Sequence, residues 1–151
     1  MLRLSKRTLY VLEAVLDIAC NARPNPVQSR DIAERQGIPQ RYLEGAMQHL
    51  VRAGILRGVR GPRGGYRLAR ERRRVSLGDV VRGVQSMEPA TDGLDEESGS
   101  ELAQNVVRPL WKGLNDHIME RLDETSIDDL CLRAEKAGIA SEGRDNLDFT
   151  I

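Results

Sequence analysis

The chain has 151 residues, of which 40% are apolar and 3% aromatic. This length predicts about one to one and a half domains, and the apolar fraction suffices for one packed core. No stretch approaches the roughly 18 consecutive apolar residues that a membrane-spanning helix needs, and residues 1–7 lack a signal-peptide apolar segment. We therefore expect a soluble cytoplasmic protein that does not bind a membrane.

Cysteine and histidine are scarce. With only Cys20 and Cys131, a disulfide-stapled scaffold is excluded. His49 and His117 lie too far from them in sequence to show zinc-ligand spacing. Each cysteine is by default a small buried side chain. A thiol-based redox role for the two cysteines remains an alternative.

Charge is distributed unevenly, although the whole chain has a net charge of zero. Residues 1–82 hold 17 Lys or Arg against 7 Asp or Glu, a net charge of +10, and residues 83–151 hold 6 against 16, a net charge of −10. This asymmetry favours a basic module that binds a polyanion. The alternative is that the charged residues only form solvated faces.

The basic half begins with a predicted helix over residues 5–20. Its apolar residues cover most of the circumference, so the helix must be packed on most sides. Glu13 and Asp17, four residues apart, are expected to be exposed. Pro24 and Pro26 then interrupt helical structure.

Residues 29–53 show the pattern of a helix-turn-helix. A short helix over 29–36 has Ser29 as its expected N-cap, and Gly37 supplies a left-handed residue at its end. A second helix follows, with Pro39 in its first turn, Gly54 at its end and one apolar stripe formed by Leu43, Ala46, Met47, Leu50 and Val51. The polar residues at the start of such a second helix can reach base edges in a major groove.

A β-hairpin is predicted next. Residues 55–60 and 66–69 form its strands, and the Gly- and Pro-rich segment 61–65 forms its turn. Arg60 and Arg63 near the turn suit a narrow minor groove. An ordinary hairpin with solvated arginines is the alternative.

These segments together resemble the Rrf2 family of bacterial winged-helix transcription factors over residues 1–87. The matching stretches are LSK at 4–6, DIAERQGI at 31–38, YLE at 42–44, VRGP at 59–62, GGY at 64–66 and the helical segment VSLGDVVRGV at 75–84. The resemblance implies a mainly α fold with a small β-hairpin wing, and a homodimer that binds double-stranded DNA at a dyad-symmetric operator. Arg63 departs from the Gly more usual in the family and adds a charge at the tip. The DNA-contacting residues that it implies are Ser5, Lys6, Ser29, Gln40, Arg41, Tyr42, Glu44, Arg60 and Arg63.

The acidic half begins with a segment, 86–101, that is expected to be mobile. An amphipathic helix of about six turns follows, with Pro109 in its first turn or at a kink. In the family the matching helix pairs with a second copy, although packing against its own domain is an alternative. Its apolar stripe, the predicted dimerisation residues, is Val107, Leu110, Trp111, Leu114, Ile118 and Leu122.

The predicted organisation has four parts. Residues 1–85 form the winged helix-turn-helix domain, 86–101 the acidic loop, and 102–138 the dimerisation helix with a short C-terminal helix. Ser126 is expected to cap that last helix over 127–136, and Gly138 to end it. The tail, 139–151, is expected to be flexible.

Family members that bind an iron–sulfur cluster carry three closely spaced cysteines before the dimer helix. Here no cysteine lies between residues 82 and 130, whereas such clusters need soft thiolate ligands. We therefore expect no cofactor and no metal. No motif for a nucleophile with its base or for a phosphate-binding loop is present, so we expect no enzyme.

The function that we expect is a sequence-specific DNA-binding transcriptional regulator, a homodimeric repressor. Its effector is open and could be a small molecule or a protein. Two alternatives remain: a thiol-based redox sensor that uses Cys20 and Cys131, and a winged helix that binds proteins.

Overall fold

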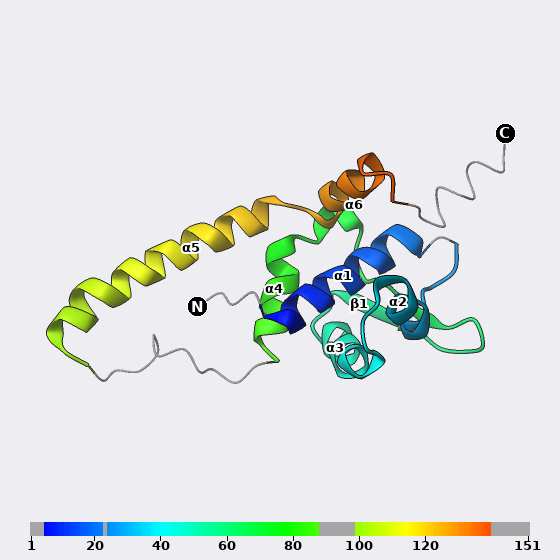
Figure 1. The fold of residues 1–151 in the computed structure, drawn as a ribbon, viewed down its shortest axis with the longest axis horizontal. Helices are drawn as coiled ribbons and strands as arrows, with labels where there is room; N and C mark the ends of the chain where they lie inside the picture. Colours follow the sequence, from blue (N-terminus) through cyan, green and yellow to red (C-terminus); the bar gives the residue numbers. More distant parts are fainter. Residues whose placement is uncertain (1–4, 23, 88–98, 140–151) are drawn as a thin grey trace.

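The computed structural model describes residues 5–22, 24–87 and 99–139. Within them lie six α-helices and one two-stranded antiparallel hairpin at the edge of the helical domain (Figure 1). The mainly helical fold with a small wing is confirmed. None of the described helices combines the length and apolar character needed to cross a membrane.

Helix α1 (Lys6–Asn21) runs through the centre of the domain. Ser5 caps it, since its side chain accepts a hydrogen bond from the Thr8 backbone N–H at 3.2 Å. Helices α2, α3, α4 and α6 and strand β2 all contact α1. The prediction that this helix is covered on most sides is confirmed, and it contributes Val11, Ala14, Val15, Ile18 and Ala19 to the core.

Helices α2 (Ser29–Gln36) and α3 (Gln40–Arg52) form the predicted helix-turn-helix. Gly37 between them has a φ of 64°, in the left-handed region. Two details of the prediction are wrong. Gln28 is the N-cap of α2 and Ser29 its first helical residue, and Pro39 is the N-cap of α3 instead of lying in its first turn.

The hairpin consists of β1 (Leu56–Val59) and β2 (Gly65–Leu68). Leu56 pairs with Leu68, and Val59 with Gly65. A 3₁₀ turn, η1 (Arg72–Arg74), then leads to α4 (Leu77–Gln85). Helix α4 starts with a capping box, because the side chains of Ser76 and Asp79 each accept the other's backbone N–H.

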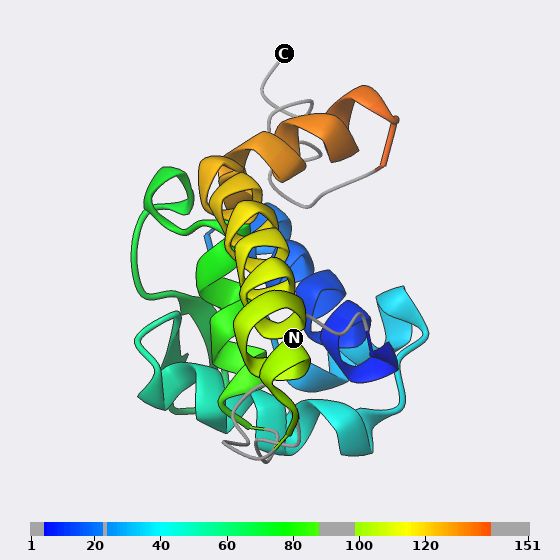
Figure 2. The same ribbon diagram turned by 90° about the vertical axis from the view of Figure 1, so that its left-hand side faces the viewer.

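A long helical rod extends from this domain (Figures 1 and 2). One turn of π-helix, η2 (Ala103–Val107), precedes α5 (Arg108–Glu124). Pro109 lies in the first turn of α5, as predicted. Proline has no backbone N–H to continue a regular helical ladder, so the irregular turn falls directly before it.

Helix α6 (Ile127–Lys136) returns to the domain and packs on α1. Ser126 caps it with Asp129 in a second capping box, and Gly138 follows it with a φ of 78°, as predicted. The backbone N–H of Leu77 donates to Thr125 at 2.8 Å, and that of Ile127 donates to Val75 at 2.8 Å. These bonds attach the corner between α5 and α6 to the start of α4.

The acidic segment 86–101 and the tail 139–151 fall largely outside the described residues. The expectations about them are therefore not tested.

Candidate nucleic-acid interface

The start of α3 presents polar side chains because its apolar stripe faces the core. Leu43, Ala46, Met47 and Leu50 are buried, as the spacing predicts. Gln40, Arg41 and Glu44 lie off that stripe and are exposed. Helix α3 and the hairpin lie on the side of the domain away from α6 (Figures 1 and 2).

A buried ion pair attaches α2 to α1. Arg35 donates to both carboxylate oxygens of Asp17, from Nε at 3.0 Å and from a terminal nitrogen at 2.8 Å. The Gln36 side chain donates to the same carboxylate at 2.8 Å. The expectation that Asp17 is exposed is therefore wrong: the residue is 3% exposed. Its partners come from the next helix, which the spacing within one helix does not indicate.

Two tyrosines connect α1 to the start of α3. The rings of Tyr10 and Tyr42 lie 5.4 Å apart at an angle of 55°, a tilted aromatic contact. Lys6 lies 5.9 Å from the centre of the Tyr10 ring, and the Arg41 guanidinium lies 5.1 Å from that of Tyr42. Two cations that are predicted to contact DNA, Lys6 and Arg41, thus lie at the two ends of this pair of tyrosine rings. Sequence reasoning missed Tyr10, whose spacing of four from Lys6 was the available signal.

The remaining predicted contact residues of the helices have local roles. Ser5 is half-buried as the cap of α1 and contacts the Thr8 hydroxyl at 3.0 Å. Ser29 is half-buried in the first turn of α2. Backbone N–H groups at the starts of these helices suit phosphate contacts.

The hairpin requires its two consecutive glycines. The backbone of Val27 pairs with Tyr66, with hydrogen bonds of 3.0 and 2.7 Å. A β-carbon on Gly65 would collide with the Val27 carbonyl, and one on Gly64 would collide with the Val59 carbonyl. The glycines therefore allow the hairpin to fold tightly and to lie against the segment before α2.

The arginines of the hairpin differ in their surroundings. Arg67 donates to the carbonyl oxygens of Ala22, at 3.2 Å, and Pro24, so it fastens the hairpin to the end of α1. Arg60 and Arg63 are exposed, and no hydrogen bond or ion pair joins their guanidinium groups to another described residue. They remain accessible to an external anion.

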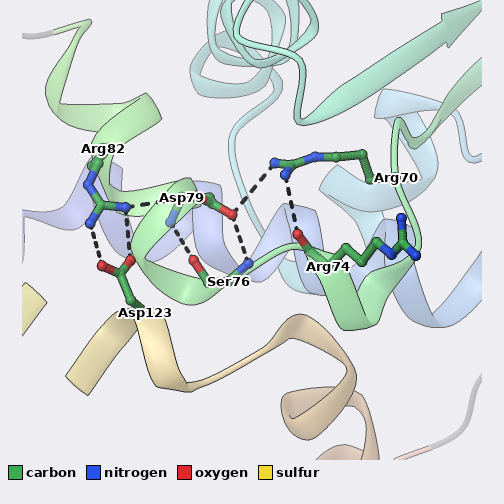
Figure 3. Close-up of polar contacts among 6 residues, drawn as sticks. All are labelled: Arg70, Arg74, Ser76, Asp79, Arg82 and Asp123. Atoms are coloured by element: carbon green, nitrogen blue, oxygen red, sulfur yellow. Dashed lines mark hydrogen bonds and ion pairs between the residues drawn. The ribbon is translucent and has the colours of Figure 1, made fainter. Parts of the chain in front are cut away.

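A polar cluster links α4 to the end of α5 (Figure 3). Arg82 donates to both oxygens of Asp123, at 2.8 and 2.5 Å. This hydrogen bonding holds the pKa of Asp123 below its usual value and raises that of Arg82. Arg70 lies 3.5 Å from Asp79 and donates to the Arg74 carbonyl at 3.3 Å. A β-carbon on Gly78 would collide with the Asp123 carboxylate, so glycine permits this close approach.

The apolar stripe of α5 is not covered by the chain's own described residues. No residue of α5 is buried, and Leu110 and Trp111 are 60% and 44% exposed. Leu122, near the corner with α6, is half-buried. The exposed large apolar side chains along this rod are Leu102, Val106, Val107, Leu110, Trp111, Leu114 and Ile118.

Comparison with known proteins places this arrangement in a family. The model of Rrf2, described as an iron-dependent transcriptional regulator, matches residues 4–133. The chain belongs to the Rrf2 family. The architecture of this Rrf2 protein is a DNA-binding winged helix with an attached helical rod, and the family consists of transcriptional regulators rather than enzymes.

Similar proteins agree with this assignment. The "HTH-type transcriptional regulator IscR" of Vibrio cholerae is 35% identical over 136 residues, 89% of this chain and 78% of that protein. The IscR of Pectobacterium atrosepticum is 33% identical over 139 residues, 92% of this chain and 85% of that protein.

Solved structures show the same fold. T. potens IscR superposes with a TM-score of 0.72 and 34% identity, over 92% of this chain and 93% of that one. CymR, the global cysteine regulator of B. subtilis, superposes with a TM-score of 0.70 and 28% identity, over 88% and 98%.

The donor set of this Rrf2 chain does not fit an iron–sulfur cluster. Such clusters are held mainly by cysteine thiolates, and the sequence has two cysteines, neither of which lies between α4 and α5. Among the described residues no three His, Cys, Asp or Glu side chains form a group that could hold a metal.

Proposed function

We propose that this Rrf2 regulator is a homodimeric repressor that binds a dyad-symmetric operator without an iron–sulfur cluster. The observation that supports this most directly is the juxtaposition of the exposed polar start of α3 with a hairpin whose tip arginines have no described partner. An α-helix fits a major groove, and arginines at a hairpin tip fit the adjacent minor groove.

The residues divide into two roles in this proposal. Gln40, Arg41, Tyr42 and Glu44 face the base edges and determine sequence preference. Ser5, Lys6, Ser29, Arg60 and Arg63 contact the DNA backbone or the minor groove, and they supply affinity that falls with salt.

The proposed partner of α5 is a second copy of this chain. Its apolar residues recur on one helix, so they form a continuous patch rather than scattered exposed side chains. A two-fold axis places the same stripe of each copy against the other. This interface buries Val107, Leu110, Trp111, Leu114 and Ile118 and sets the spacing of the two α3 helices.

In vitro selection from a random DNA library, combined with sedimentation equilibrium, tests the proposal. We expect a dimer and a selected palindrome whose half-sites are about one helical turn apart. The Leu114→Glu variant should be monomeric and lose this preference. Lys112→Glu, which introduces the same residue at an exposed position off the stripe, should remain dimeric.

Four results would each overturn a part of the proposal. A monomeric wild-type protein without sequence preference would contradict the operator-binding dimer. Partner-protein binding that is insensitive to salt, without any DNA affinity, would favour a protein-interaction module. Stoichiometric iron and sulfide in anaerobically purified protein would contradict the absence of a cluster. Reporter transcription that rises when the protein is removed would support repression, and transcription that falls would contradict it.

A further inference from the structure

The two cysteines of the chain meet, although 111 positions separate them in sequence. The sulfur atoms of Cys20, near the end of α1, and Cys131, in α6, lie 3.0 Å apart. Both are free thiols. The resemblance to the family did not indicate this contact, and nothing in the proposed DNA interface uses it.

The surroundings of the pair make the two thiols unequal. Cys131 accepts a hydrogen bond from Cys20 and also interacts with Arg72, and these contacts lower the pKa of Cys131. The same thiol–thiol contact and burial raise the pKa of Cys20. Arg72 is held by Asp128 of α6 at 2.7 Å, so its cation stays beside the sulfurs. The carboxylates of Asp128 and Asp17 oppose thiolate formation, but Arg72 and the thiol contact have the larger effect on Cys131.

A thiolate that lies against a second thiol is the arrangement needed for reversible oxidation. We propose that Cys20 and Cys131 are a redox-active dithiol that hydrogen peroxide or an organic hydroperoxide converts to an intramolecular disulfide. The pair is partly exposed through Cys20, whereas Cys131 is 6% exposed, so a small oxidant suits the site better than a protein.

The reaction has two balanced steps. The Cys131 thiolate attacks one oxygen of the hydroperoxide, the O–O bond breaks, and Cys131 sulfenic acid forms with release of water or an alcohol after protonation. The Cys20 sulfur then attacks the Cys131 sulfur, and the hydroxyl group leaves as water with the Cys20 proton. Two thiols are thus oxidised by two electrons to one disulfide, and the hydroperoxide is reduced to water and either water or an alcohol.

Disulfide formation changes the packing of α1. The S–S bond is about 2.05 Å long, so the sulfurs must approach by about 1 Å. Cys20 lies one helical turn after Asp17, which holds Arg35 and Gln36 of the helix preceding α3. A shift of this end of α1 is therefore transmitted to the helix-turn-helix. We expect the oxidised protein to bind its operator about tenfold more weakly, a typical coupling between two sites; this effect rests on the proposed function.

Peptide mapping of the full-length protein tests the chemistry without reference to DNA. One equivalent of hydrogen peroxide, added to anaerobically reduced protein, should give a Cys20–Cys131 cross-linked peptide that dithiothreitol removes. The Cys20→Ser variant should instead accumulate Cys131 sulfenic acid, which dimedone traps. In the Cys131→Ser and Cys131→Ala variants, the remaining thiol is Cys20. Its oxidation rate should be at least about tenfold lower than the oxidation rate of Cys131 in the wild-type protein.

Several outcomes would overturn the dithiol. These are retention of both thiols, a disulfide that joins two chains, or faster oxidation of Cys20 than of Cys131 in the single variants. Circular dichroism of each variant shows that it is folded.

DNA affinity is measured separately, on the selected operator, for reduced and oxidised protein. The switch is supported if the oxidised wild-type protein binds the operator more weakly than the reduced protein does, and if peroxide treatment leaves the operator affinity of the Cys20→Ser variant unchanged. Equal affinities, with the cross-link present, would overturn the switch but not the dithiol. Failure of the reduced protein to bind DNA would overturn the proposed function, while the cross-link would still establish the dithiol.

Discussion

Asp17 of α1 and Arg35 of α2 form a two-point ion pair in which the carboxylate is fully buried and the guanidinium is partly exposed. The contact fixes the first helix of the helix-turn-helix against the central helix of the domain. A buried carboxylate that loses its partner is left largely uncompensated.

The Arg35→Ala variant should therefore be less stable by about 2–3 kcal/mol, because Gln36 and nearby solvent compensate for only part of the loss. Urea unfolding at a fixed protein concentration measures the free energy of unfolding. Arg30→Ala, an exposed arginine on the same helix, is the control and should change it by less than about 0.5 kcal/mol. Equal effects of the two substitutions would show that the pair is not important for stability.

Arg41 tests the reading of base edges by α3. If its guanidinium contacts a guanine, Arg41→Ala should weaken operator binding by about 1–3 kcal/mol and leave affinity for random DNA almost unchanged. Arg52→Ala, at the opposite end of the same helix, should change neither the affinity for the operator nor the affinity for random DNA. Fluorescence anisotropy with both DNAs measures the difference. An equal loss on both DNAs after Arg41→Ala would identify a phosphate contact instead.

The glycines of the hairpin provide a matched test of the wing. Gly64→Ala should distort the turn, because its β-carbon would meet the Val59 carbonyl, whereas a β-carbon on Gly58 meets no atom within 4 Å. We expect Gly64→Ala to weaken operator binding about tenfold, or about 1.4 kcal/mol, and Gly58→Ala to leave it nearly unchanged. Binding titrations with both variants measure this. A normal affinity for Gly64→Ala would show that the wing does not contact the operator.

The ion pair between Arg82 and Asp123 predicts a dependence on pH. Because Arg82 lowers the pKa of Asp123 in the folded protein, the pair stabilises the fold above the unfolded pKa, near 3.8. This stabilisation is lost as the pH falls through the lower folded pKa. Both side chains are substantially exposed, so the contribution at neutral pH should be below about 1 kcal/mol.

Carbon-detected NMR titration of the Asp123 carboxyl measures this pKa directly. In Arg82→Gln it should rise toward the usual value, and the stability difference from the wild type should vanish at acidic pH. The Arg121→Gln variant, which removes an exposed arginine two positions from Asp123, should leave the low pKa in place. An unchanged pKa in Arg82→Gln would contradict the assigned cause.

Local patterns were sufficient to predict most of the elements and the exposed part of the candidate site. The stripe from Leu43 to Leu50 determined which side of α3 is buried, and therefore left Gln40, Arg41 and Glu44 exposed. The glycine-rich turn indicated the hairpin, and Ser126 indicated the start of α6. These features depend on residues within about one or two turns of one another, so periodicity and capping preferences report them.

Contacts between distant segments were decided by the tertiary structure alone. The sequence by itself determined that Asp17 is helical, but its burial depends on Arg35 from another helix. It likewise predicted helices containing Cys20 and Cys131, but only the return of α6 onto α1 brings the two sulfurs together. A helical period repeats every 3.6 residues and carries no information about which face of which other helix will lie opposite. Which faces lie opposite one another depends on how the apolar sides of all the helices pack together into a single core.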